Sequence, residues 1–262
     1  MLFTMFSRWF NFSIEEKNMP AKFLIVRSFF ILALIFILFL FFGCDITGSD
    51  DTAIEFEYDF SESEKSWEPF FTDYNVGWGE KMNLTSDYRT LPEPLNTDQK
   101  AHFISAVNHS DDVKMLFRRQ VSANLEPNTT YSVQFTVRFA TEVPSGCVGI
   151  GGPPGEAVRV IADASFLKPE PVVEDEYYLL NIQHEEDSFD WYQNVQMGDI
   201  ANSRECEDGY EFEIKEVSSG PNHARVATNE SGQAWLMFGT RSGFEGQTDL
   251  YYTYFRAEFS EM

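Results

Sequence analysis

The stretch Thr130-Tyr-Ser-Val-Gln-Phe-Thr-Val-Arg-Phe139 decides the fold. Apolar side chains occupy every second position, which is the period of a β-strand with one buried face and one face in water. The residues before it, Glu126 to Thr129, include Pro and Asn and predict a turn. The predicted inward-facing side chains are Tyr131, Val133, Phe135, Val137 and Phe139.

Similar short apolar stretches recur along the chain. Ile54–Phe60 alternates apolar and acidic residues, so Ile54, Phe56, Tyr58 and Phe60 are expected on one face. Further strands are predicted at 102–107, 114–121, 157–164, 177–182, 210–217, 224–228, 234–239 and 249–259. Strands separated by Gly, Pro, Asn and Asp, without an amphipathic helix, predict an all-β fold, a single antiparallel β-sandwich over residues 53–262. Glu185–Asp199 is acidic and is predicted to be a long loop.

The N-terminal region contains the longest apolar run. Phe29–Phe42 is 14 residues long and ends at Gly43-Cys44. A membrane-spanning helix needs about 20 residues, whereas the apolar core of a secretory signal peptide has about 7–15. Lys22 and Arg27 supply the positive flank of such a peptide, so residues 1–43 are interpreted as a signal peptide whose translation could start at Met19.

The Gly43-Cys44 junction resembles a bacterial lipobox, although Phe41 stands where that motif prefers Leu. The resemblance implies that the chain is cut before Cys44, that this Cys carries lipid, and that the protein is held on a bacterial membrane outside the cytoplasm. Residues 44–52 would then be the lipidated Cys and a polar tether. Cleavage nearby without lipidation and a retained signal anchor are the alternatives. The inner and outer membranes are not distinguished.

The charge of the chain limits its partners. The net charge is −23 at pH 7, and it becomes −25 without residues 1–43, which contain four basic and two acidic residues. Such a surface repels nucleic acid and anionic lipid, so nucleic acid is excluded as a partner.

Two cysteines remain after Cys44. An exported protein meets an oxidising environment, so Cys147 and Cys206 are expected to form a disulfide. Two free thiols in separate loops are the alternative. A zinc site is not expected, because no His stands at ligand spacing from either Cys.

Several stretches resemble the carbohydrate-binding-module or galactose-binding type of jelly roll. They are Tyr58–Phe60 with Lys65–Trp67, then Leu125–Tyr131, and finally Gln233–Gly239 followed by Asp249–Phe259. The resemblance implies a jelly-roll sandwich in which the first and last strands pair. Some modules of this type hold a structural Ca²⁺ through acidic residues in the last strand, but Tyr252-Thr-Tyr254 contains none.

Three further stretches resemble parts of uncharacterised bacterial lipoproteins, a similarity that implies no activity. They are Asn108–Asp112, Gly198–Asn202 and Ser242–Gly246. The first is also the candidate polar site of the chain. Its side chains Asn108, His109, Asp111 and Asp112 could present hydrogen-bonding groups to a sugar or oxygen ligands to Ca²⁺. The alternative is a turn that bonds only to its own backbone.

Aromatic side chains are the second class of candidates. Exposed rings stack on flat ligands such as sugars, so Trp78, Trp191 and Tyr192 are candidate contacts. Core packing is the alternative for Trp78 and its neighbours.

Catalytic motifs are not recognised in the sequence. Cys147–Gly155 lacks the Gly-Lys-Ser/Thr ending of a phosphate loop, and Ser219-Gly220 is not a nucleophile elbow. Carboxylates are too abundant to identify a glycosidase pair. The leading hypothesis is therefore a non-catalytic binding domain for carbohydrate or a similar polar ligand. The alternatives are an envelope lipoprotein that binds another protein and, less favoured, a glycan-active enzyme.

Overall fold

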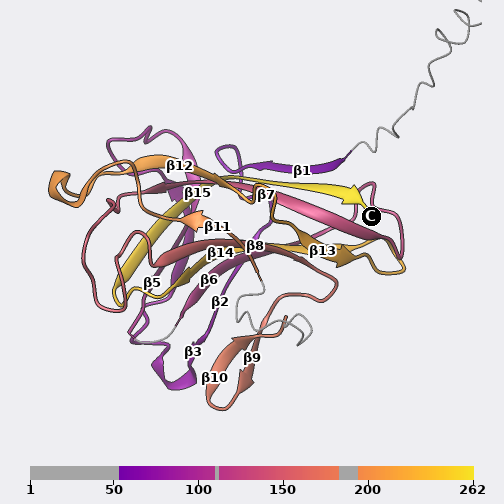
Figure 1. The fold of residues 1–262 in the computed structure, drawn as a ribbon, viewed down its shortest axis with the longest axis horizontal. Coiled ribbons are helices and arrows are strands. Elements are labelled where there is room, and N and C mark those ends of the chain that lie inside the picture. The colour runs from indigo at the N-terminus through magenta and orange to yellow at the C-terminus, as the bar shows by residue number, and fades with distance from the viewer. Residues whose placement is uncertain (1–52, 110–111, 183–193) are drawn as a thin grey trace, which may run out of the picture. The chain divides into compact units, whose positions relative to one another are not determined.

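The computed structural model describes residues 53–109, 112–182 and 194–262 (Figure 1). The seven-stranded sheet contains β1 (Ile54–Asp59), β4 (Thr85–Thr90), β5 (Lys100–Val107), β7 (Thr130–Thr141), β12 (Glu213–Ser218), β13 (Ala224–Ala227) and β15 (Gln247–Glu261). The five-stranded sheet contains β2 (Glu68–Thr72), β6 (Lys114–Val121), β8 (Val158–Ser165), β11 (Val195–Asp199) and β14 (Ala234–Ser242). A small third sheet joins β3 (Tyr74–Asn75), β9 (Pro171–Glu174) and β10 (Tyr177–Leu180).

The two large sheets form an antiparallel β-sandwich of jelly-roll type. The chain alternates between them, because β5 and β7 belong to one sheet and β6 and β8 to the other. Near the C-terminus β14 inserts between β6 and β8, and β15 inserts between β5 and β7. Figure 1 shows these two layers stacked on each other. The predicted fold class is therefore confirmed, and the predicted pairing of the first and last strands is present as β1 against β15.

Aromatic rings fill the space between the sheets. Phe238 of β14 stacks on Phe255 of β15 with ring centroids 4.6 Å apart, and Trp67 meets both rings edge-on. The alternation in β7 buries its five predicted inward side chains, as expected. Each ring in this core removes a large apolar area from water and contributes strongly to stability.

Some strands differ from the sequence prediction. β11 lies within the stretch 185–199, which was predicted to be a loop. The strand was missed because a register shift between Gln196 and Gly198 interrupts its alternation. β2 was not predicted, because Phe70 and Phe71 are adjacent and point to opposite faces of the sheet. β9 is exposed along its whole length and shows no alternation.

The strand β15 gives the sandwich two distinct ends. The segment that begins β1 lies beside the C-terminal part of β15, with Ile54 opposite Phe259. The N-terminal residue of β15, Gln247, lies beside Val107. These two places are roughly 40 Å apart at about 3.3 Å per residue. We call the end at Gln247 the distal end.

Within the described ranges, no helix is long and apolar enough to cross a membrane.

Candidate functional site

Two neighbouring strands, β5 and β15, and the segment before β12 place aromatic side chains on the outer face of the seven-stranded sheet near the distal end. Phe103 of β5 lies opposite Tyr251 of β15, and their ring centroids are 4.8 Å apart. Phe212, which comes just before β12, meets Tyr251 edge-on at 5.5 Å. Tyr251 therefore lies between two rings, yet it is only half-buried.

A guanidinium group borders these rings. Arg89 of β4 lies over Phe103, with its Cζ atom 3.9 Å from the ring centroid. Arg89 also lies close enough to influence the side chain of Tyr251, and it forms an ion pair with Asp87 at 3.2 Å. Burial raises the pKa of Tyr251, and Arg89 partly opposes that rise.

Two carboxyl groups lie next to the rings. Ser105 Oγ donates to Asp249 Oδ1 at 2.6 Å, and Gln247 Nε2 donates to the same oxygen at 3.0 Å. Glu142 follows β7 and is half-buried. Burial raises the pKa of Glu142, and the nearby negative charge of Asp249 raises it further. We define the Tyr251 cluster as the seven residues Arg89, Phe103, Ser105, Glu142, Phe212, Asp249 and Tyr251.

One buried amide side chain fixes the segments that carry Glu142 and Phe212. Asn202 Nδ2 donates to the carbonyl oxygen of Glu211 at 2.9 Å, and the Asn202 backbone N–H donates to that of Val143 at 2.8 Å. A longer bond of 3.5 Å joins Asn202 Nδ2 to the carbonyl of Thr141. Because each buried donor has a partner, the two segments are held at a fixed separation.

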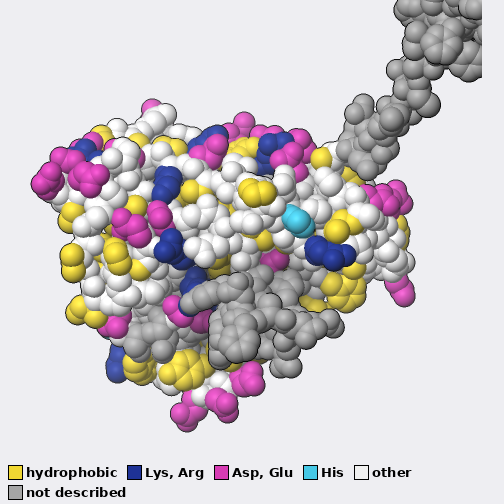
Figure 2. Space-filling view, in the orientation of Figure 1, with side chains coloured by type: hydrophobic (Ala, Val, Ile, Leu, Met, Phe, Trp, Pro, Cys, Tyr) yellow, Lys and Arg dark blue, Asp and Glu magenta, His cyan; other side chains and the backbone are white. Residues whose placement is uncertain are grey.

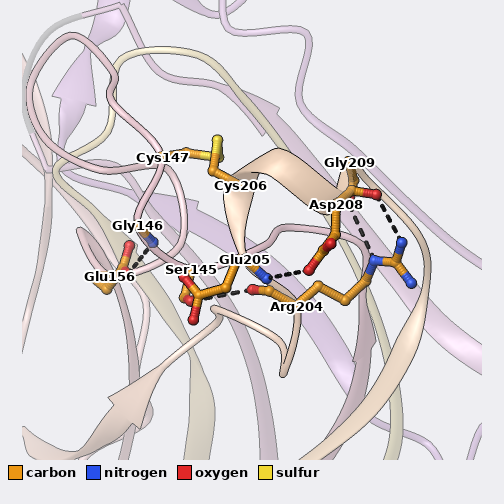
Figure 3. Close-up of a disulfide and its surroundings, with 9 residues drawn as sticks. All are labelled: Ser145, Gly146, Cys147, Glu156, Arg204, Glu205, Cys206, Asp208 and Gly209. Atoms are coloured by element: carbon orange, nitrogen blue, oxygen red, sulfur yellow. Dashed lines mark hydrogen bonds between the residues drawn. A yellow bond between two sulfur atoms is a disulfide. The ribbon is translucent and has the colours of Figure 1, made fainter.

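A disulfide joins the same two segments further out (Figure 3). Cys147 and Cys206 are bonded, as expected from the sequence. Beside them the Ser145 backbone N–H donates to the Arg204 carbonyl at 2.8 Å. The Arg204 guanidinium in turn donates to the Asp208 carbonyl at 2.8 Å, which closes the turn around Cys206.

The stretches 108–112, 198–202 and 242–246 contribute polar contacts to the distal end. Asn108 is 2% exposed, and its Nδ2 donates to the carbonyls of Ser242 and Phe244 at 2.8 and 3.0 Å. Asn108 therefore holds the β14–β15 turn, while Asn202 holds the segment before β12. Their common position explains why polar residues gather in these stretches.

The predicted ligand residues do not gather in the Tyr251 cluster. Asp112 forms an ion pair with Arg241, and His109 Nε2 lies 2.9 Å from the Lys81 carbonyl. Trp78 is half-buried, with the Lys81 ammonium 5.3 Å from its ring centroid. Cys44, Asp111, Trp191 and Tyr192 lie outside the described residues.

The sequence contained one signal for the cluster. Asp249 and Tyr251 alternate with the buried Leu250 and Tyr252, so both face outward on a predicted strand. Glu142 and Phe212 join them only through cross-strand packing, which a single sequence does not reveal.

The described residues were also compared with the requirements of a metal site. Among the described residues, no group of three or more His, Cys, Asp or Glu side chains is placed to hold a metal ion. A Ca²⁺ site at loop 108–112 stays a prediction, because Asp111 falls outside the described ranges.

The chemistry of the Tyr251 cluster suits a neutral polar ligand with an apolar face. Aromatic rings pack against C–H groups, ionised carboxylates accept hydrogen bonds, and a guanidinium donates them. No metal or covalent chemistry is needed for such binding.

Comparisons with known proteins add the following. No family model and no curated protein matches the chain. Among solved structures, the mannan-recognising module TmCBM27 aligns at 10% identity over 80% of this chain and 99% of its own, with a TM-score of 0.35. TmCBM61, solved with β-1,4-galactotriose, aligns at 9% identity over 73% of this chain and 87% of its own, with a TM-score of 0.34. The enzymatically active domain of bacteriophage CBA120 tailspike protein 4 aligns at 9% identity over 75% of this chain and 19% of its own, with a TM-score of 0.31. TM-scores of this size do not establish a common origin, so the function of the site is inferred from its own geometry.

Proposed function

We propose that residues 53–262 form a non-catalytic carbohydrate-binding domain whose ligand contacts the Tyr251 cluster. The observation that supports this function most directly is the half-buried ring of Tyr251, which lies near the charged groups of Arg89, Asp249 and Glu142. A sugar ring offers an apolar C–H face together with hydroxyl groups that donate and accept hydrogen bonds. The ring of Tyr251 can pack against the C–H face, and the carboxylates and the guanidinium can bond the hydroxyl groups. Such binding needs no catalytic step.

The surrounding structure favours a site that is formed before the ligand arrives. Asn202 and the disulfide hold the two segments that carry Glu142 and Phe212. A preformed site loses less conformational entropy on binding, which favours affinity.

The proposal includes the membrane anchor. Lipid on Cys44 would hold the domain through residues 45–52, which reach roughly 25–30 Å when extended. The Tyr251 cluster lies near the distal end, roughly 40 Å along β15 from the start of β1. The proposed anchor would therefore join the domain near the start of β1, at the end of β15 opposite the Tyr251 cluster. Acidic side chains, which Figure 2 shows in several groups with Lys and Arg between them, would discourage contact with anionic lipid.

A glycan array with the purified protein, run with and without Ca²⁺, tests the function. The protein should bind a defined class of glycan, and Tyr251→Ala should weaken binding about tenfold, the change expected for ~1.4 kcal/mol. The matched control is Tyr254→Ala on the same strand, because Tyr254 also faces outward and packs under Arg138, away from the cluster. Equal losses for both variants would place the ligand elsewhere, and no binding in either condition would favour a protein partner.

A further inference from the structure

The loop that carries Cys147 presents two aliphatic side chains to water. Val148 is 98% exposed and Ile150 is 71% exposed, the highest values among the large apolar residues described. Single exposed apolar residues are common on protein surfaces. Two of them on a loop that is held firmly in place need a separate explanation.

Several contacts hold this loop. The disulfide joins Cys147 to Cys206, and Glu156 Oε1 accepts a hydrogen bond from the Gly146 N–H at 2.8 Å (Figure 3). Gly149 lies so close to Phe244 that a β-carbon there would be 2.6 Å from the ring. Val148 and Ile150 therefore flank a glycine that is packed against the body of the domain.

The same loop is continuous with the Tyr251 cluster. The Glu245 backbone N–H donates to the Ile150 carbonyl at 2.8 Å. Two residues later Gln247 begins β15 and donates to Asp249 of the cluster. At its other end the loop starts at Glu142, which is itself a member of the cluster. The loop that carries the aliphatic side chains is therefore joined at both ends to segments that carry the cluster.

We propose that Val148 and Ile150 extend the glycan-binding face and contact sugar units beyond the one at Tyr251. This inference rests on the proposed function and specifies its ligand as a chain of several sugars. Aliphatic side chains pack against the C–H face of a sugar, and each square ångström of apolar surface removed from water contributes about 25 cal/mol. The Cys147–Cys206 bond acts as a positioning element, because it fixes the loop beside the cluster before the ligand binds.

The charge around the loop argues against an anionic membrane as its occupant. The disulfide and the Ser145–Arg204 hydrogen bond bring Glu205, Glu207 and Asp208 close to the loop, and these acidic residues would repel an anionic lipid surface.

The test compares oligosaccharides of two lengths. Gluco-, manno-, galacto- and xylo-oligosaccharides with β-1,4 linkages are titrated as disaccharides and hexasaccharides into the wild-type protein and into a Val148→Asp/Ile150→Asp variant. The wild type should bind the hexasaccharide of one class at least about tenfold more tightly than the disaccharide, a difference of ~1.4 kcal/mol. The double variant should lose that length advantage and keep its affinity for the disaccharide. The matched control is Val173→Asp, because Val173 is 63% exposed on β9 outside the loop.

The second part of the test removes the disulfide by substitution. A Cys147→Ser/Cys206→Ser variant that keeps its circular dichroism spectrum should also lose the length advantage. The inference is overturned if the Asp variant keeps the length advantage, or if sedimentation shows that Val148 and Ile150 instead join two copies of the chain. The proposed function fails, and this inference fails with it, if the wild type binds none of these sugars. The same holds if the Tyr251→Ala variant binds them as tightly as the wild type does.

Discussion

Single residues at the distal end show how buried polar groups determine the shape of a site. Asn108 and Asn202 are both buried, and each uses its side-chain N–H groups to bond backbone carbonyls of other segments. Leaving such carbonyls without a donor costs about 1–3 kcal/mol per group. Asn108 was predicted as a ligand residue. Its side chain holds the β14–β15 turn, and its contact with a ligand stays a prediction.

Glu142 gives a pH-dependent prediction. Burial and Asp249 raise the pKa of Glu142 above its ordinary value, so the folded protein favours the protonated carboxyl group. The contribution of protonated Glu142 to the free energy of unfolding is complete below the ordinary pKa of glutamic acid, and it is lost as the pH rises through the raised pKa. Glu142→Gln stays neutral at every pH and avoids that loss. Its free energy of unfolding should therefore exceed that of the wild type increasingly as the pH rises from 4 towards 7, as measured by urea denaturation.

Glu230→Gln is the control for this prediction, because Glu230 is exposed on the β13–β14 connection. The free energy of unfolding of this variant should equal that of the wild type at both pH 4 and pH 7. A Glu142→Gln protein with the same pH dependence as the wild type would contradict the assigned environment.

At the level of strands, regular alternation decided what could be predicted. β7 alternates regularly, and β15 alternates over long stretches on both sides of a register shift at Tyr252/Tyr254, so the predicted positions of both strands are confirmed. The polar edge strand β4 and the bulged strand β11 lack that signal, because one face of β4 is in water and β11 contains a register shift. The Tyr251 cluster shows the same limit. Its β15 residues could be identified as outward-facing, but Glu142 and Phe212 reach them only through the fold.

The pairing of β1 with β15 gives a prediction about stability. Phe60, just after β1, is fully buried and packs on His102, Phe238 and Trp67. Phe60→Ala should lower the free energy of unfolding by about 3–5 kcal/mol, because it leaves a cavity between the sheets. Glu55→Gln on the same strand removes only a surface ion pair with Arg256 and should cost less than about 1 kcal/mol. Similar losses for both, measured by chemical denaturation, would mean that the first strand adds little to the core.

At the scale of the whole molecule, the fold separates the start of β1, where the proposed anchor would be joined, from the candidate site. The chain enters the sandwich at β1, while the Tyr251 cluster, the disulfide and the loop with Val148 lie towards the other end of β15. A net charge of −23 disfavours polyanionic partners and is compatible with the proposed neutral ligand. This arrangement suits a domain that is held at one end and binds at the other.

The proposed anchor can be tested in the bacterial cell. Cys44→Ser removes the thiol that would carry lipid, so the variant should appear in the soluble fraction or accumulate as an unprocessed precursor. The physical reason is that acyl chains hold a protein at a bilayer by about 0.8 kcal/mol per buried methylene, and stable attachment takes two signals. Ser49→Ala in the tether leaves Cys44 intact and should stay with the membranes. A Cys44→Ser variant that is processed normally and recovered only after detergent extraction would contradict the lipid anchor. The apolar stretch 29–42 must then itself be the anchor, and the chain between membrane and domain would begin at that stretch rather than at Cys44.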